Sequence, residues 1–332
     1  MTSQQAIGID IGGTKIAAGL IGRHGLVGEL EVIATDPESG GSMVLQRALA
    51  LGRSILARNP RATEPSAIGI AAGGWIDTAS GRVVGATALL PGWAGIDLRA
   101  AFEGELGIRA TAVNDVQAMG VAEARLGAGR SCGMCLCVAV GTGIGGAITI
   151  DGRLFGGARG YAGAIGHIAA SRSGPRCSCG RRGCIEAEAS GPAIARSFDA
   201  CRRRGASQGA SAASGSALPD VVRAIESADR AAHECALDVT ATAGTRLGRV
   251  LGGLANALDP DVIIVGGGAA AALGEHFLAA IRTGVAEAAL DMIKPGVVPS
   301  QLGASASVVG AGLFALDGVD ASTEEPSEPS VS

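Results

Sequence analysis

Aromatic side chains are scarce in this sequence: Phe, Trp and Tyr together make up 2% of its 332 residues. The core must therefore be built from Ala, Val, Leu and Ile, in a chain that is 47% hydrophobic and long enough for two packed lobes. Charge is also sparse, at 17% of residues with a net charge of −4 and no long basic run. This composition excludes a nucleic-acid partner.

Long uninterrupted hydrophobic runs are missing as well. Residues 131–150 carry no charge, but five glycines interrupt them, so we expect a loop and a new strand and no membrane span. The first residues lack a basic segment, and Asp10 breaks the first apolar run, which argues against a signal peptide. The eight cysteines then indicate a cytoplasmic protein that uses thiols for metal binding instead of disulfides.

Two similar units, each a strand, a glycine-rich turn and a second strand, occupy 7–21 and 135–150 and suggest an internal duplication. Hydrophobic spacing adds the following elements: helices over 42–58, 97–106, 116–126 and 228–258, and strands over 67–71, 82–85, 110–113 and 262–265. This order predicts a two-lobed α/β kinase or ATPase. We expect one lobe over 1–118, completed by 300–317, a larger one over 119–299, a mobile loop over 202–217 and a disordered tail over 318–332.

One histidine and three cysteines lie close together in the segment 166–186. His167, Cys177, Cys179 and Cys184 match the ligand set of a closed tetrahedral zinc site, and Glu186 follows two residues after the last thiol. The alternative is chance cysteines beside a histidine whose hydrogen bonds are satisfied. Three other cysteines, Cys132, Cys135 and Cys137, stand in an apolar run and are expected to be buried strand residues.

A phosphate-binding turn is indicated by Asp10-Ile11-Gly12-Gly13-Thr14-Lys15. Backbone amides in a glycine turn bind anions, Thr14 and Lys15 add donors, and Asp10 could hold Mg²⁺ against the phosphate. Glycine-rich hairpin turns are common, however, so this motif alone does not decide between phosphate binding and a simple turn.

Gly141-Thr142-Gly143-Ile144-Gly145-Gly146 has the spacing of a dinucleotide fingerprint, but a strand and not a helix is expected after it. A β-hairpin phosphate loop is therefore the better interpretation. Gly266-Gly267-Gly268 follows a buried strand, where it either lets adenine approach the backbone or makes a plain strand-to-helix turn.

Asn114 and Asp115 stand between a strand and a helix. Ligands of α/β proteins bind at the carboxyl ends of strands, and a carboxylate there can accept a hydroxyl proton during phosphoryl transfer. The alternative, which the local sequence alone favours, is that Asp115 is only the N-cap of the helix.

Taken in order, these motifs resemble the ROK family of sugar kinases over residues 6–315. The resemblance implies an actin/Hsp70-like (ribonuclease H-like) two-lobed ATPase fold with a structural zinc loop. It further implies ATP, with Mg²⁺, held by residues 10–15 and 141–146 and by Gly267 and Gly268. Asp115 would be the general base toward a primary sugar hydroxyl, and the implied sugar contacts are Gly74, Asn114, Asp115, His167 and Glu186. His167 would bind zinc through one ring nitrogen and face the substrate with the other.

Two departures from the family pattern bear on the substrate. Ala164 stands where these kinases usually have Glu, and Leu89 where they usually have Asn. Each lost polar contact should cost ~1–3 kcal/mol of glucose binding. We therefore expect a hexose-like substrate such as an amino or deoxy sugar or a cyclitol. The resemblance also implies a homodimer or homotetramer. The alternatives are a sugar sensor or a catalytically weak relative, and the nine residues before Asp10 leave no room for the DNA-binding domain of ROK repressors.

Overall fold

The computed structural model describes residues 4–59, 65–86, 90–205 and 215–323. Leu89, most of the expected loop over 202–217 and the tail from 324 on lie outside these ranges. The chain divides into two compact units. The first unit comprises residues 1–126, 156–161 and 304–332, and the second comprises 127–155 and 162–303. The first stretch ends at 126 and not at 118, because the helix over 115–126 packs on the C-terminal helix within the first unit.

The first unit is built on a five-stranded sheet of order β3-β2-β1-β4-β7. Its strands are β1 (Gln5–Ile11), β2 (Lys15–Gly22), β3 (Gly25–Ala34), β4 (Ala67–Ala72) and β7 (Ala110–Asn114). The first three form an antiparallel meander, whereas β4 and β7 run parallel to β1. A short hairpin, β5 (Trp75–Asp77) and β6 (Arg82–Gly85), stands apart from this sheet.

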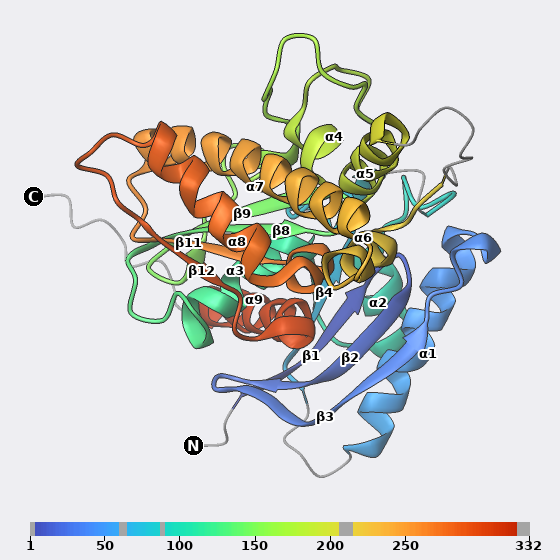
Figure 1. Ribbon diagram of the computed structural model, residues 1–332. Helices are drawn as coiled ribbons and strands as arrows, with labels where there is room; N and C mark the ends of the chain where they lie inside the picture. The colour runs from blue at the N-terminus through green and yellow to red at the C-terminus, as the bar shows by residue number, and fades with distance from the viewer. Residues whose placement is uncertain (1–3, 60–64, 87–89, 206–214, 324–332) are drawn as a thin grey trace, which may run out of the picture. The chain divides into compact units, whose positions relative to one another are not determined.

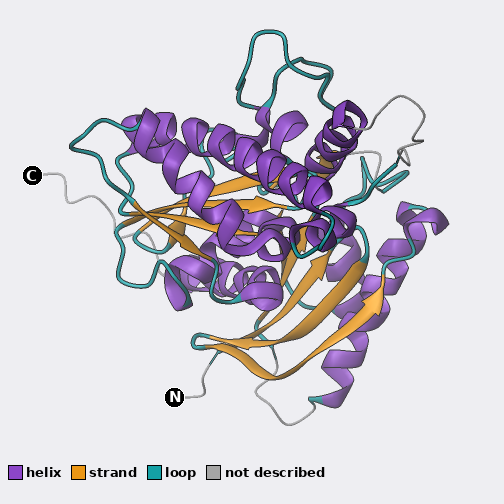
Figure 2. Cartoon of the chain, viewed as in Figure 1, coloured by secondary structure: helices purple, strands orange, loops and turns teal. Residues whose placement is uncertain are grey.

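Both faces of this sheet are covered, which follows from the alternation of side chains along β1. Ile7, Ile9 and Ile11 share a core with α1 (Gly41–Arg58) and α2 (Leu98–Leu106). Gly8 faces the other way, against α9 (Ala306–Thr323), which also packs on α3 (Asp115–Leu126). Figure 2 shows α1 running beside the strands. Asp10, two residues after Gly8, therefore points to the same face as α9.

The second unit repeats this topology with a sheet of order β10-β9-β8-β11-β12. Its strands are β8 (Met134–Val140), β9 (Ile144–Ile150), β10 (Arg153–Leu154), β11 (Val262–Gly266) and β12 (Gly296–Pro299). Again three antiparallel strands are extended by two parallel ones. The shared order supports the internal duplication expected from the two strand–turn–strand motifs.

Helices cover the second sheet in a layer dominated by the pair α7 (Arg230–Leu258) and α8 (Gly268–Ala288), which lie side by side (Figure 1). Three smaller helices, α4 (Ile185–Ala189), α5 (Gly191–Gly205) and α6 (Leu218–Ile225), pack on α7. Cys135 and Cys137 are buried on β8 as expected, whereas Cys132 precedes the strand and is half-buried.

A disulfide joins Cys201 of α5 to Cys235 of α7, with the two Cα atoms 5.8 Å apart. The expectation that thiols serve metal binding instead of disulfides was therefore wrong for this pair. The two cysteines are 34 residues apart in sequence and meet only because α5 packs on α7.

Other differences concern the ends of elements. Residues 318–323, expected to be disordered, continue helix α9, and residues 202–205 complete α5. Strand β3 was not predicted, because its outward residues break the apolar alternation. Among the described residues, no helix is both long enough and apolar enough to span a membrane.

Candidate active site and metal centre

The residues expected to form the site are distributed over both units, and each group is described within its own unit. In the first unit, Gly12, Gly13 and Thr14 form the turn between β1 and β2. The amide of Gly12 donates to the carbonyl of Lys15 (3.0 Å), which closes the turn. Thr14 and Lys15 are exposed, and a side chain at Gly13 would meet no atom within 4 Å. The turn therefore offers accessible backbone and an ammonium group.

Thr35, which the sequence analysis did not single out, fixes this turn in place. Its buried hydroxyl donates to the carbonyl of Gly12 (2.7 Å), and its amide donates to the carbonyl of Thr14 (3.1 Å). Nothing in the local sequence distinguishes Thr35 from a surface threonine, since it follows the unpredicted strand β3.

Asp10 lies beside the turn with an unusual electrostatic environment. Its Oδ1 atom is buried without a hydrogen-bond partner. Burial, helped by the nearby charge of Asp115 and opposed by Lys15, raises the pKa of Asp10 from 3.8 to about 7. Asp10 and Asp115 are thus close enough to repel each other, although they are 105 positions apart in sequence.

Asn114 and not Asp115 caps helix α3. The Oδ1 of Asn114 accepts from the amides of Val116 (2.9 Å) and Gln117 (3.2 Å), as an N-cap does. Its Nδ2 donates to the carbonyl of Gly74 (3.0 Å). The alternative in which Asp115 is only the N-cap is therefore wrong. The Asp115 carboxylate does accept from Val116 (2.9 Å), but burial outweighs this bond and raises its pKa.

The turn Gly73–Gly74 lies against Asp115. A Cβ atom on Gly73 would be 3.9 Å from Asp115 Oδ2, with no other atom closer, so the carboxylate has open space on this side. The turn is held by Asn114 and by Trp93, whose fully buried indole donates to the Gly73 carbonyl (3.2 Å). Gly74 has a φ of 106°, which explains glycine there. Trp93 was not singled out from the sequence, although it is one of only two tryptophans in the chain.

In the second unit, the turn Gly141–Gly143 joins β8 to β9. The strand that follows confirms a β-hairpin loop and excludes a dinucleotide-binding helix. Its internal bond runs from the Gly141 amide to the Gly143 carbonyl (2.9 Å), and Thr142 at its tip is exposed. Gly145 lies in β9 and pairs with Ala139.

Gly267 and Gly268 make a strand-to-helix turn from β11 into α8. Gly267 has a φ of 91°, and a Cβ atom there would lie 2.4 Å from the Val140 carbonyl oxygen. Glycine is therefore required at position 267, because the backbone there packs against the end of β8. A side chain at Gly268 would meet no atom within 4 Å, so this position is open.

Glu186 connects the β8–β9 turn to the cysteine segment. Its Oε2 accepts from the Ile144 amide (3.0 Å), and its Oε1 accepts from the Ser178 hydroxyl (3.1 Å). The Sγ of Cys177 is 3.6 Å from the same Oε1. The carboxylate is held in one orientation, as its position two residues after Cys184 suggested.

The four expected metal ligands are brought together. The ligand atoms of His167, Cys177, Cys179 and Cys184 all lie within 4.8 Å of one another. Cys179 and Cys184 have sulfurs 3.7 Å apart, and Cys177 Sγ is 3.6 Å from His167 Nδ1. Tetrahedral zinc with Zn–S bonds near 2.3 Å requires sulfurs ~3.8 Å apart, so the cluster fits the ion. The Nδ1 atom is the ring nitrogen on the cluster side.

Comparison with known proteins identifies relatives along the whole chain. The model of the ROK family matches residues 6–317. A glucokinase of Halalkalibacterium halodurans is 30% identical over 324 residues, 94% of this chain and 95% of that protein. An N-acetylmannosamine kinase of Shigella boydii is 30% identical over 85% of this chain and 88% of that protein. The crystal structure of a ROK family glucokinase from Streptomyces griseus with glucose and AMPPNP has a TM-score of 0.77 at 30% identity, covering 94% and 99% of the two chains.

Proposed function

Because this chain belongs to the ROK family, whose members among its relatives include glucokinases and an N-acetylmannosamine kinase, we propose that it transfers a phosphoryl group from ATP to the primary hydroxyl of a hexose-like compound. The observation that carries the proposal is that the Asp115 carboxylate is not needed as the helix cap and has space beside it. Asn114 performs the helix capping, and Gly73 leaves space beside the carboxylate. Both observations support Asp115 as the general base.

In the proposed reaction Asp115 accepts the proton of the attacking hydroxyl as that oxygen bonds to the γ-phosphorus of ATP, while the bond from this phosphorus to the β–γ bridging oxygen breaks and ADP leaves. Amides of the turns at 12–14 and 141–143, with Lys15, would hold the phosphates, and Gly268 would leave room for the nucleoside. Asp10 fits a magnesium ligand, because its buried Oδ1 has no other partner. Magnesium, when bound, neutralises charge on the phosphates. Asn114, Gly74, His167 and Glu186 would surround the sugar.

We further propose a modified hexose or a cyclitol as the substrate in preference to plain glucose. Ala164, at the start of the short helix Ile165–His167, is exposed and presents a methyl group. No carboxylate can therefore accept a sugar hydroxyl at that position. An N-acetylmannosamine kinase among the relatives supports amino sugars as one candidate class.

The test is ADP release with ATP and Mg²⁺ across hexoses, amino sugars, deoxy sugars and cyclitols. Asp115→Asn, which keeps the size of the side chain, should lower kcat by at least ~100-fold with little change in KM for ATP. Unchanged turnover in this variant would refute the assignment of the base. Ala164→Glu should improve kcat/KM for glucose by ~10- to 100-fold, and efficient use of glucose by the unmodified protein would refute the substrate proposal.

We also propose that the cluster of His167 with three cysteines holds a structural zinc ion. Burial raises the pKa of Cys184 to about 12, so a bound ion must displace its proton. Elemental analysis of the purified protein should give one zinc per chain, and Cys179→Ser should remove it. A protein that is folded and fully stable after verified loss of zinc would contradict the structural role.

A further inference from the structure

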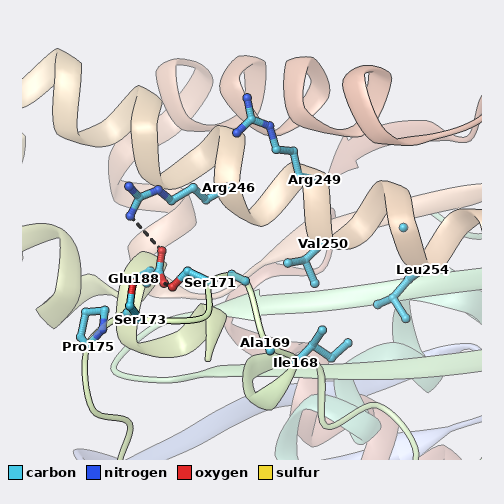
Figure 3. Close-up of a pocket in the computed structure, with 13 residues that line it drawn as sticks. Ile168, Ala169, Ser171, Ser173, Pro175, Glu188, Arg246, Arg249, Val250 and Leu254 are labelled. Carbon is cyan, nitrogen blue, oxygen red and sulfur yellow. Dashed lines mark hydrogen bonds and ion pairs between the residues drawn. The ribbon is translucent and has the colours of Figure 1, made fainter. Parts of the chain in front are cut away.

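A pocket of about 770 Å³ lies in the second unit, and none of its lining residues is one assigned above to catalysis or metal binding. Three elements line it: the segment 168–175, helix α4 and one face of α7 (Figure 3). The volume falls within the usual range for sites of small molecules, ~300–1,000 Å³. No function described so far uses this pocket.

An ion pair between a half-exposed arginine and a buried carboxylate is built into its wall. The Glu188 side chain is 3% exposed and accepts from Arg246 Nη1 (2.8 Å) and from the Ser171 hydroxyl. Figure 3 shows Arg246 reaching from α7 toward Glu188 with Ser171 beside it. Both carboxylate oxygens are engaged, so Glu188 is held in place and orients Arg246. What the wall offers is donors.

Arg249, one turn further along α7, adds a second guanidinium. Its Nε donates to Glu287 (2.7 Å), and its side chain is 59% exposed. A guanidinium carries five N–H donors, so each of these arginines has more donors than its ion pair uses. The segment 171–182 next to the pocket contributes four arginines and no carboxylate. The pocket and its flanking segment therefore carry more basic than acidic residues.

We propose that this pocket binds a compact anion carried on a sugar-sized body, namely a phosphate monoester of a polyol. The phosphate would accept from Arg246, Arg249 and the Ser173 hydroxyl. Ile168, Val250 and Leu254 supply the apolar surface against which the carbon skeleton would pack.

The pocket is connected to the proposed active site through its own wall. The segment 168–175 follows His167 directly, and the Ala170 amide donates to the Gly183 carbonyl (2.7 Å) beside Cys184. Helix α4 carries Glu186 toward the β8–β9 turn and Glu188 toward the pocket. A ligand held by Ser173 and Arg249 would thus stabilise the cysteine segment. Any effect on turnover rests on the proposed function, but binding itself does not.

The test is hydrogen–deuterium exchange of the full-length protein without nucleotide, with glucose 6-phosphate, inorganic phosphate or glucose as probes. Glucose 6-phosphate should slow exchange over 168–175, and glucose should not. Arg249→Gln should weaken this protection by about 10-fold in ligand concentration. Arg230→Gln is the matched control: it makes the same change on the same helix, at a residue paired with Glu234 outside the pocket.

Protection by inorganic phosphate alone, lost in Arg249→Gln, would assign binding to the anion and still support the site. Equal protection in wild type and Arg249→Gln would place the ligand elsewhere and overturn the proposal. So would an absence of protection at millimolar ligand. A change of oligomeric state in Arg249→Gln, measured by light scattering, would also overturn it, since this face would then be a protein interface. None of these readouts requires the enzyme to turn over.

Discussion

Replacing Asp10 by Asn should make the metal-free protein more stable at neutral pH and should change how its stability depends on pH. Burial of the carboxylate raises the pKa of Asp10 from 3.8 to about 7 in the folded state. The folded protein therefore favours the protonated form of Asp10. The contribution of this preference to the free energy of unfolding is complete below pH 3.8. It is lost as the pH rises toward 7, because the unfolded chain ionises first. Asn resembles the neutral carboxyl group and keeps that stability at every pH.

The size of the effect follows from the two pKa values. A rise of the pKa from 3.8 to about 7 corresponds to a loss of about 4 kcal/mol of unfolding free energy above pH 7, at ~1.4 kcal/mol per pKa unit. Roughly 1.5 kcal/mol of this is already lost at pH 5. The gap between Asp10→Asn and wild type should therefore widen by about 2.5 kcal/mol between pH 5 and pH 8.

Urea unfolding in EDTA at pH 5, 6, 7 and 8 measures this gap, and the difference between the two proteins cancels most other titrating groups. Adding Mg²⁺ at pH 8 should stabilise wild type more than the variant, because the ion binds the ionised carboxylate. A gap that stays constant with pH would refute the buried carboxylate. A variant less stable than wild type at pH 8 in EDTA would show that Asp10 has a stabilising partner.

Three further predictions concern Trp93, the metal ligand candidate Cys179 and the disulfide of Cys201. Trp93→Phe should leave the Gly73 carbonyl unpaired, lower the unfolding free energy by ~1 kcal/mol and reduce kcat more than it raises KM, as urea unfolding and steady-state kinetics would show. Cys179→Ser should lose zinc, and the melting temperature and activity should fall together, whereas a loss of activity alone would contradict a structural ion. Cys201→Ser should destabilise the oxidised protein by ~3–4 kcal/mol for a loop of 34 residues and make its stability insensitive to dithiothreitol; an effect of dithiothreitol that persists in this variant would place the redox-sensitive group elsewhere.

The sequence predicted two glycine turns, a carboxylate after a strand and a group of four possible metal ligands, because each lies in a short motif whose chemistry is local. The structure has both turns and brings the four side chains together. Glycine turns, clustered thiols and a carboxylate after a strand all remain within about ten residues. What the sequence missed depends on tertiary contacts. Thr35 reaches the turn from another strand, and Trp93 reaches Gly73 across 20 residues. Cys201 and Cys235 meet only after two helices have packed.

The repulsion between Asp10 and Asp115 shows the same limit. Each residue was selected for its own neighbours, whereas the pKa of Asp10 is raised mainly by burial and further by the nearby charge of Asp115. Burial at a site, unlike residue type, is a property of the assembled structure. Which of Asn114 and Asp115 caps helix α3 was likewise decided only by the hydrogen bonds of Asn114 in the structure.

The close packing of α9 has a consequence for the order of events during synthesis. Gly8 and Gly69 of the first sheet admit the backbone of α9 so closely that a Cβ atom would come within 2.2 Å of Val308 and 1.8 Å of Ala311 carbonyl oxygens. That helix is synthesised after all of the second unit. One face of the N-terminal strands therefore stays uncovered while some 180 further residues are synthesised, which takes roughly 10–40 seconds. The second unit, whose residues all precede residue 304, can therefore fold before the first unit receives its last helix.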